Sequence, residues 1–305
     1  MRPDLSSLAS MIEGRVVTRF APSPTGYLHL GHVVHALYVW GVARALGGHV
    51  VMRIEDHDRL RSRPEYESAL VEDLGWLGFE PDSGASPRLR QSDTPAVYEE
   101  ALARLRRTHH VYACECSRKE IGSERYGGRC RDRGLREAPG RGLRVEMGRE
   151  VESFEDGLLG LQEQTPADQC GDLLVRDRDG QWTYQFAVTV DDLRQGISLV
   201  IRGADLTSST GRQIALARML GRARAPVFLH HPLIRDDSGN KLSKSASDTG
   251  VRELRAAGVD AAGVIGRAAF LVGLVDRPRP LPAHEVPLHF LRSDPSAGPG
   301  LQVPN

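Results

Sequence analysis

The first sixty residues alternate between short apolar runs and one longer periodic segment. Residues 16–20 form an apolar run that ends at two prolines and a glycine, which predicts a strand followed by a loop. The next apolar side chains recur at helical spacing, at Leu30, Val34, Leu37 and Trp40. Residues 49–56 predict a buried strand that ends in acidic side chains. This order is a βαβ unit, so the predicted fold class is α/β with a doubly wound parallel sheet.

The periodic pattern is lost between residues 109 and 172, where cysteine, glycine and arginine dominate, and this range is predicted to be an insertion. Regular patterns then return. They predict a strand leading into a helix over 182–193, a strand over 197–206, a helix over 209–221 and a strand over 227–236. Beyond about residue 276 the chain is rich in proline, and we expect it to be only partly ordered.

Composition and charge are those of an ordinary globular protein. Apolar residues make up 40% of the chain and charged residues 26%. No run of 18 apolar residues and no signal peptide is present, so we expect a cytoplasmic protein without a membrane span. The 40 basic side chains balance 40 acidic ones, which argues against binding to nucleic acid through bulk charge. The arginine-rich stretch 125–144 fits either a local basic patch or a solvated loop.

Three of the four cysteines lie close together in the sequence, at Cys114, Cys116 and Cys130. In a reducing compartment such a cluster indicates a metal site rather than disulfides. Zinc usually takes four ligands, and a closed site of thiolates would serve structure rather than catalysis. Spacing alone leaves the fourth ligand open among His109, His110, Cys170 and Tyr126. It also leaves open that the cysteines are reduced and hold no metal.

Two further motifs carry candidate chemistry. His29 and His32 lie at the start of the predicted helix, with Gly31 between them, where free N–H groups and the helix dipole attract an anion. The imidazoles would donate hydrogen bonds to phosphate oxygens. Lys241 and Lys244, two of only three lysines, lie in the sequence KLSKS, and their ammonium groups suit a mobile phosphate.

These two motifs and three others resemble those of class I aminoacyl-tRNA synthetases, and more closely the glutamate-specific branch. The motifs that carry the resemblance are RFAPSPTGYLHLGH (19–32), RIEDHD (53–58), WTYQFAVTVDD (182–192), IRGADL (201–206) and KLSKS (241–245). They occur in the family's order over roughly residues 15–245. The resemblance implies a Rossmann-type catalytic domain that binds ATP, Mg²⁺ and glutamate.

The resemblance also implies roles for individual residues. The glutamate site would contain Arg19, Phe20, Ala21, Pro22, Ser23, Glu55, Tyr184 and Arg202. The ATP site would contain His29, Gly31, His32 and Lys244, and the catalytic groups would be His29, His32, Lys241 and Lys244. The family's zinc pattern matches Cys114, Cys116, Tyr126 and Cys130, so Tyr126 is the expected fourth ligand through resemblance alone.

The resemblance divides the chain into six parts. We expect a loose N-terminal extension (1–14), the first half of the catalytic domain (15–108), an insertion with a zinc site (109–172), the second half of the catalytic domain (173–250), a short helical segment (251–275) and a proline-rich, partly disordered tail (276–305). This leaves no room for the helical anticodon-binding domain of a full glutamyl-tRNA synthetase.

The outline therefore fits a truncated paralogue within the family. Such a paralogue activates glutamate without tRNA and esterifies it to queuosine in the anticodon stem-loop of tRNA(Asp), and we expect a monomer. Three alternatives stay open: a truncated enzyme that charges tRNA(Glu), a nucleotidyltransferase of the same fold, and a non-catalytic RNA-binding relative. The glutamate-site residues argue against a nucleotidyltransferase, and the retained histidines and lysines argue against a non-catalytic relative.

Overall fold

The computed structural model describes residues 2–122, 125–234 and 250–291. Its strands are β1 (Val17–Phe20), β2 (His49–Met52), β3 (Val111–Cys114), β4 (Gly142–Val145), β5 (Glu152–Asp156), β6 (Gly160–Gln164), β7 (Leu173–Arg176), β8 (Leu199–Gly203) and β9 (Val227–His231). Its helices are α1 (Leu5–Met11), α2 (Leu30–Ala45), α3 (Pro64–Leu77), α4 (Pro95–Thr108), α5 (Arg118–Ile121), α6 (Pro166–Gln169), α7 (Tyr184–Arg194), α8 (Thr210–Met219), α9 (Val251–Ala256), α10 (Ala261–Leu271) and α11 (Val286–Leu291). Two 3₁₀ helices, Ala204–Ser209 and Ala283–Glu285, complete the regular structure of this part of the chain.

Parallel strands form the centre of the molecule, as predicted. β1 pairs with β2 in parallel, and β8 pairs with β9 in parallel. The amide of Ser198 donates to the carbonyl of Val17 at 2.9 Å, which brings β1 beside β8. The sheet is mixed rather than purely parallel, because β5 joins β9 and β6 runs antiparallel to β5. The α/β class is therefore confirmed, with an antiparallel edge contributed by residues 152–164.

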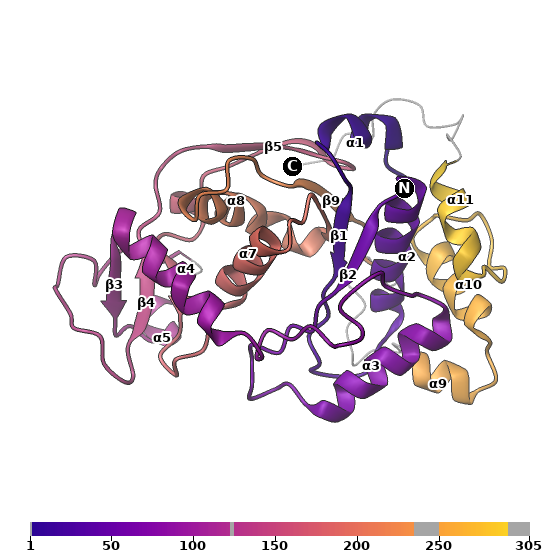
Figure 1. The fold of residues 1–305 in the computed structure, drawn as a ribbon, viewed down its shortest axis with the longest axis horizontal. Coiled ribbons are helices and arrows are strands. Elements are labelled where there is room, and N and C mark those ends of the chain that lie inside the picture. Colours follow the sequence, from indigo (N-terminus) through magenta and orange to yellow (C-terminus); the bar gives the residue numbers. More distant parts are fainter. Residues whose placement is uncertain (1, 123–124, 235–249, 292–305) are drawn as a thin grey trace.

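Both faces of this sheet are covered. Side chains on one face, among them Phe20, Met52 and Ile201, pack against α2 and reach α10 and α11. Side chains on the other face, among them Val200 and Phe228, pack towards α8. Figure 1 shows α2, α10 and α11 on one side of β1 and β2, with α7 and α8 on the other. Successive side chains of a strand point to opposite faces of the sheet, so each central strand contributes buried side chains to both faces.

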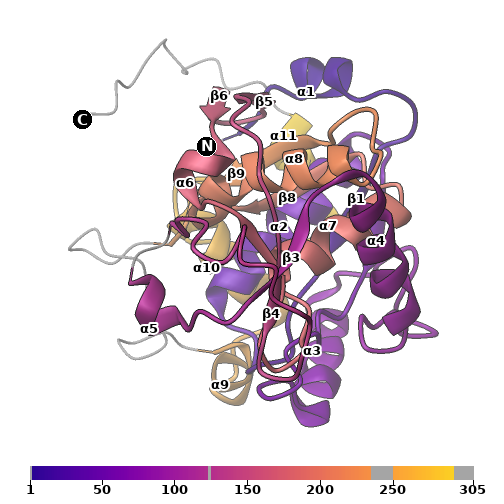
Figure 2. The same cartoon turned by 90° about the vertical axis from the view of Figure 1, so that its left-hand side faces the viewer.

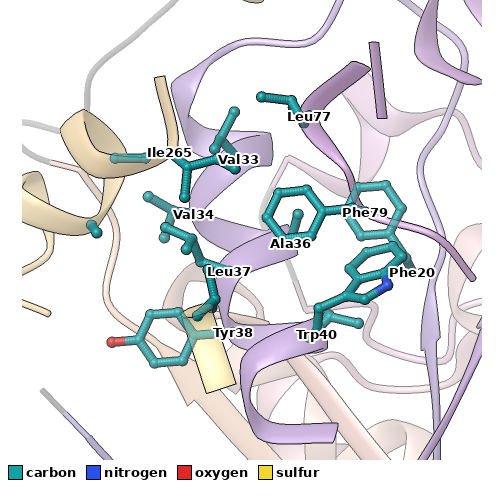
Figure 3. Close-up of a cluster of buried hydrophobic side chains, with 14 of the residues drawn as sticks. Phe20, Val33, Val34, Ala36, Leu37, Tyr38, Trp40, Leu77, Phe79 and Ile265 are labelled. Atoms are coloured by element: carbon teal, nitrogen blue, oxygen red, sulfur yellow. The ribbon is translucent and has the colours of Figure 1, made fainter. Parts of the chain in front are cut away.

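The core on the α2 face is built from aromatic and branched side chains. Phe20 contacts Trp40, with ring centroids 5.2 Å apart, and Trp40 contacts Phe79 at the same centroid distance. Figure 3 shows these rings beside Val33, Val34 and Leu37 of α2, with Ile265 of α10 approaching from the opposite side. Because α2 is apolar on nearly all sides, it is buried between the sheet and the C-terminal helices.

A second sheet, β3–β4–β7, is entirely antiparallel. It has its own core, in which Leu143 and Val175 pack with Tyr98 of α4 and Phe186 of α7. β3 and β4 lie at the end of the molecule opposite α9–α11, and Figure 2 views the molecule from that end. The predicted insertion thus contributes strands to both sheets, since β3 and β4 belong to the second sheet while β5 and β6 join the first.

The alternating pattern at 182–193 predicted a strand before a helix, and this prediction is wrong. Residues Tyr184–Arg194 form α7, and only the isolated bridge of Arg176 to Trp182 is strand-like. The reason is burial on all sides: every residue from Phe186 to Asp192 is buried, so the apolar positions show no 3.6-residue period.

The N-terminal end of the chain also differs from the expectation. Residues 1–14 were expected to be loose, but Asp4 caps α1 and Leu8 is fully buried. In the tail, α11 packs against α2, where Phe290 is 3% exposed. A Cβ on Gly41 would lie 2.2 Å from the Phe290 ring, so this close approach requires glycine. Residues 292–305 lie outside the described structure.

Candidate functional site

The start of α2 brings the two predicted histidines together. His29 is the N-cap, and its Nδ1 accepts a hydrogen bond from the amide of Gly31 at 3.1 Å. The Nδ1 of His32 accepts from the amide of His29 at 3.2 Å. Since Nδ1 is an acceptor in both rings, the proton of each neutral imidazole lies on Nε2 and can be donated to an anion. The ring centroids are 4.0 Å apart.

Gly31 is necessary for this arrangement. A Cβ on Gly31 would lie 2.9 Å from Cε1 of His29, so a larger residue would displace the capping ring. The lysines Lys241 and Lys244 lie outside the described residues. The chain returns beside the histidines directly after that segment, because Gly250 forms a bridge with His29 and the amide of Val251 donates to the carbonyl of Leu28 at 2.9 Å.

A buried network of charges lies at the carboxyl ends of β1 and β2. Arg19 donates through Nε to the Asp192 carboxylate at 3.2 Å and through Nη1 to the carbonyl of Ile201 at 3.1 Å. Arg53 donates through Nη1 to Asp192 at 2.9 Å and through Nη2 to Glu55 at 2.8 Å. All of these charged side chains are less than 10% exposed. The network joins the two halves of the sheet.

The pKa shifts in this network follow from the pairing. Burial alone would raise the pKa of Asp192, but Arg19 and Arg53 hold it below its usual range. Burial alone would lower the pKa of Arg53, yet Asp192, Glu55 and Asp191 raise it. Both groups are therefore charged at neutral pH, and each charge is compensated by a neighbour.

Arg202, at the end of β8, is held by three further side chains. Its Nε donates to Nε2 of His230 at 3.0 Å, Nη1 to Oε1 of Gln213 at 2.6 Å and Nη2 to Oγ1 of Thr210 at 2.8 Å. Burial lowers the pKa of the Arg202 guanidinium, but an arginine remains protonated.

Tyr184 is subject to the charges of both groups. Burial raises the pKa of the Tyr184 hydroxyl, and the charges of Arg202 and Glu55 act on it in opposite directions. The site therefore offers a buried cation at Arg202 and a buried anion at Glu55 within reach of one tyrosine. This arrangement suits a zwitterionic ligand with an additional carboxylate.

Four other predicted glutamate-site residues lie at the end of β1, with Phe20 as its last residue and Ala21, Pro22 and Ser23 in the loop that follows. The Phe20 side chain is fully buried in the core, so only its backbone is available to the site, and its carbonyl accepts from the Arg53 amide at 3.0 Å. Pro22 accepts from the amide of Glu55 at 3.0 Å, which ties the loop to the end of β2. Ala21 is half-buried and Ser23 is exposed.

Sequence analysis did not assign Arg53, Asp192, Asp156 or His230 to the site. A signal was present for two of them, since Arg53 interrupts an apolar run and Asp192 lies in a segment that is otherwise apolar. A charge inside a buried element must be paired, and its partner is then a second functional candidate. The hydrophobic pattern gives no such signal for Asp156.

The cysteine cluster lies where β3 ends. The Sγ atoms of Cys114, Cys116 and Cys130 all lie within 4.8 Å of one another, and all three residues are buried. The Tyr126 hydroxyl lies 3.5 Å from Sγ of Cys114 and accepts from the amide of Cys130 at 2.8 Å. Three thiols and a phenol that converge in a closed, buried space fit the donor set of a structural zinc ion.

The other three candidate ligands make contacts elsewhere. His109 lies 2.8 Å from Oγ1 of Thr108, and His110 lies 3.3 Å from Glu146. The Cys170 thiol donates to the carbonyl of Pro166 at 3.2 Å. Among the described residues, Tyr126 is therefore the candidate whose side chain lies with the three thiols.

An arginine contacts each of the three sulfurs. Arg144 donates to Sγ of Cys114 at 3.4 Å, Arg129 to Sγ of Cys116 at 3.4 Å and Arg133 to Sγ of Cys130 at 3.7 Å. Arg144 also lies 3.8 Å over the Tyr126 ring. Burial raises the pKa of Cys116, which Arg129 opposes. Burial acts in the same direction on Cys130, but hydrogen bonds from the Glu115 backbone, Tyr126 and the neighbouring thiols lower the pKa of Cys130 to about 7. The thiolate is the form that binds metal.

Comparisons with known proteins agree on one family. Residues 15–266 match the family described as the catalytic domain of class I tRNA synthetases of the E and Q type. The glutamyl-Q tRNA(Asp) synthetase of Symbiobacterium thermophilum is 40% identical over 88% of this chain and 90% of its own. That of Nitratidesulfovibrio vulgaris is 39% identical over 87% of each chain.

A solved structure extends the likeness to three dimensions. The glutamate tRNA ligase of Elizabethkingia meningosepticum, determined in complex with its amino acid, superposes with a TM-score of 0.72 at 28% identity. The match covers 84% of this chain but only 60% of that ligase.

Proposed function

Because the chain belongs to the family of catalytic domains of class I tRNA synthetases for glutamate and glutamine, and within it to the glutamyl-Q tRNA(Asp) synthetases, we propose that it activates L-glutamate with ATP and transfers it to queuosine in the anticodon of tRNA(Asp). The observation that carries the proposal is the pair of buried, opposite charges at Arg202 and Glu55, which both act on Tyr184. A buried guanidinium can grip the side-chain carboxylate of glutamate, while the free oxygen of the Glu55 carboxylate accepts from its α-amino group.

Activation is an in-line displacement at the α-phosphorus of ATP. An oxygen of the glutamate α-carboxylate attacks, the bond from the α-phosphorus to the bridging oxygen breaks, and pyrophosphate leaves. The Nε2–H groups of His29 and His32 stabilise the charge that develops on the α-phosphate oxygens. Lys244, helped by Lys241, and Mg²⁺ would hold the phosphates. A hydroxyl of the queuosine ring then attacks the activated carbonyl, and AMP leaves.

The zinc ion belongs to a different part of the molecule. Cys114, Cys116, Cys130 and Tyr126 would hold it, and a closed site leaves no open position for substrate. Its contribution would be to fold the segment between β3 and β4. Among the described residues no helix is long and apolar enough to cross a membrane. We expect the reaction to take place in the cytoplasm, with the protein acting as a monomer.

Glutamate-dependent exchange of pyrophosphate into ATP, measured without RNA, tests the proposal. We expect exchange with glutamate, much less with glutamine or aspartate, and none in the Lys244→Ala variant. Exchange that appears only after addition of tRNA would favour the alternative enzyme, which charges tRNA(Glu). No exchange under either condition would refute activation and favour a non-catalytic RNA-binding relative.

A further inference from the structure

A chain of buried hydrogen bonds reaches Arg202 from the strand β5. Nδ1 of His230 lies 2.6 Å from Oδ2 of Asp156, and Nε2 of His230 lies 3.0 Å from Nε of Arg202. Asp156 is 3% exposed, His230 1% and Arg202 3%. The three residues come from three different strands, and no assigned role uses Asp156 or His230.

The chemistry of Arg202 fixes the proton on His230. An arginine N–H is always a donor, so Nε2 of His230 must be the acceptor. A neutral imidazole then carries its proton on Nδ1 and donates it to Asp156. A doubly protonated ring would place an N–H group against another N–H group. Burial lowers the pKa of His230, which agrees with the neutral form.

The other oxygen of Asp156 is held just as firmly. Oδ1 accepts from the amides of Leu158 at 3.0 Å and Leu159 at 2.9 Å, at the turn between β5 and β6. The carboxylate therefore cannot rotate without losing backbone hydrogen bonds. The fixed carboxylate orients the His230 ring, and the ring in turn orients the plane of the Arg202 guanidinium.

We propose that Asp156 and His230 are positioning residues that fix Arg202 in the orientation in which it binds the side-chain carboxylate of the amino acid. The inference rests on the proposed function. A guanidinium has five N–H donors, and three of them are used by His230, Gln213 and Thr210. One N–H on each terminal nitrogen then remains, and together they can bind the two oxygens of a carboxylate. A bidentate grip requires this plane to be set before the ligand arrives.

The substitution Asp156→Asn tests the proposal without removing bulk. The amide oxygen stays with the two backbone amides, so the NH₂ group takes the place of Oδ2 and faces His230. Nδ1 of His230 must then accept, its proton moves to Nε2, and two donors face each other at Arg202. We expect KM for glutamate to rise about ten- to a hundredfold. We expect kcat and KM for ATP to change less than about threefold, because the reacting phosphates lie at the histidines of α2.

Two further variants separate positioning from folding. Glu155→Gln makes the same change of carboxylate to amide at the exposed neighbour on β5, and it should behave as wild type. The double variant Asp156→Asn/His230→Gln offers Arg202 an amide oxygen in place of the ring nitrogen. In this double variant, KM for glutamate should return most of the way to the wild-type value. A purely structural role of Asp156 does not explain such a rescue.

The outcomes are distinct. An unchanged KM for glutamate in Asp156→Asn would overturn the proposal. So would a fall in kcat that accompanies a lower melting temperature and is not rescued by His230→Gln. If the wild-type protein shows no exchange but binds glutamate in calorimetry, the activation proposed above fails, and the dissociation constant replaces KM in the same comparison. Absence of glutamate binding in the wild type would overturn both proposals.

Discussion

Arginine serves the two sites of this molecule in different ways. In the proposed glutamate site, Arg19, Arg53 and Arg202 are buried, and Arg19 and Arg53 donate to groups 182 and 139 positions away along the chain. Around the cysteine cluster, Arg129 and Arg133 are exposed and contact sulfurs 13 and 3 positions away along the chain. The pocket is a product of the whole fold, whereas the cluster is mostly a local structure.

The two sites therefore depend on different properties of the chain. In the pocket every guanidinium is oriented by several fixed acceptors, so its geometry is set before a ligand binds. In the cluster the thiols are brought together by a short segment, and a bound metal supplies much of the folding energy of such a site. A change in one site should therefore leave the other largely intact, and this can be tested from both sides.

The largest effect is expected at the cluster, for the binding of zinc. We expect about one zinc ion per chain, and Cys116→Ser should lower zinc affinity about 10²–10³-fold, since one of four ligands is lost. The segment 111–145 should also become more sensitive to trypsin. Competition with a chromogenic chelator measures the affinity.

Cys170→Ser is the matched control for that experiment, because Cys170 is buried but bonds to a backbone carbonyl outside the cluster. It should keep its zinc. If Cys116→Ser raised KM for glutamate as much as a substitution within the pocket does, the two sites would not be independent.

The next effect is expected in the pocket. Arg202→Gln should lower kcat/KM for glutamate-dependent exchange about a hundredfold, because truncating a buried, hydrogen-bonded charge costs roughly 2–5 kcal/mol. Zinc content should not change. Arg218→Gln, on the exposed surface of α8, is the control. The Arg218 side chain is 60% exposed, so the loss of its ion pair with Glu152 should have a small effect. A loss below about fivefold for Arg202→Gln would contradict the assignment of the carboxylate site.

The smallest effect is expected for the pH dependence of the free energy of unfolding, through His231 at the end of β9. Burial lowers the pKa of His231 to about 4, below the value near 6.5 expected in the unfolded chain. Between pH 4 and 6.5 the unfolded chain therefore binds more protons, so stability rises with pH in this window and is lost on acidification. From pH 6.5 to 5, His231 alone should account for a loss of about 1.5 kcal/mol in the free energy of unfolding.

Urea unfolding at the two pH values measures this loss. His231→Gln should show a smaller dependence on pH than the wild type, because its side chain does not titrate. An equal dependence in both proteins would assign the loss to other groups, such as His35, whose pKa burial also lowers and whose Nδ1 lies 3.3 Å from Nε2 of His231.

The local parts of this structure could be predicted from the sequence. The strands and helix at 16–56 follow from their hydrophobic period, and α2, bounded by Leu30 and Ala45, agrees with the prediction. The cysteine cluster is marked by the spacing of Cys114, Cys116 and Cys130, whereas spacing leaves the fourth residue open and the family resemblance points to Tyr126, whose hydroxyl lies 3.5 Å from Sγ of Cys114. In each case the residues that act together lie within about twenty positions of one another.

The long-range parts could not be predicted in this way. The strand β5 alternates between buried and exposed residues, but two of its three buried side chains are Glu152 and Asp156, so hydrophobicity does not reveal it. Its partner residue, His230, lies 74 positions away. Likewise α7 has no amphipathic period, because it is buried on all sides. A buried polar side chain on an otherwise alternating strand, such as Asp156, carries no signal until its partner is known.

The ion pairs of the pocket also bear on how the protein is made. Arg19 and Asp192 are 173 residues apart, and Arg53 and Asp192 are 139 apart. A ribosome adds roughly 5–20 residues per second, so Arg19 waits about 10–40 s for its partner to be synthesised. Unpaired charges are costly to bury, so the N-terminal half cannot close around them during that time. We therefore expect the buried charges of this site to delay folding of the first half until the second half has been synthesised.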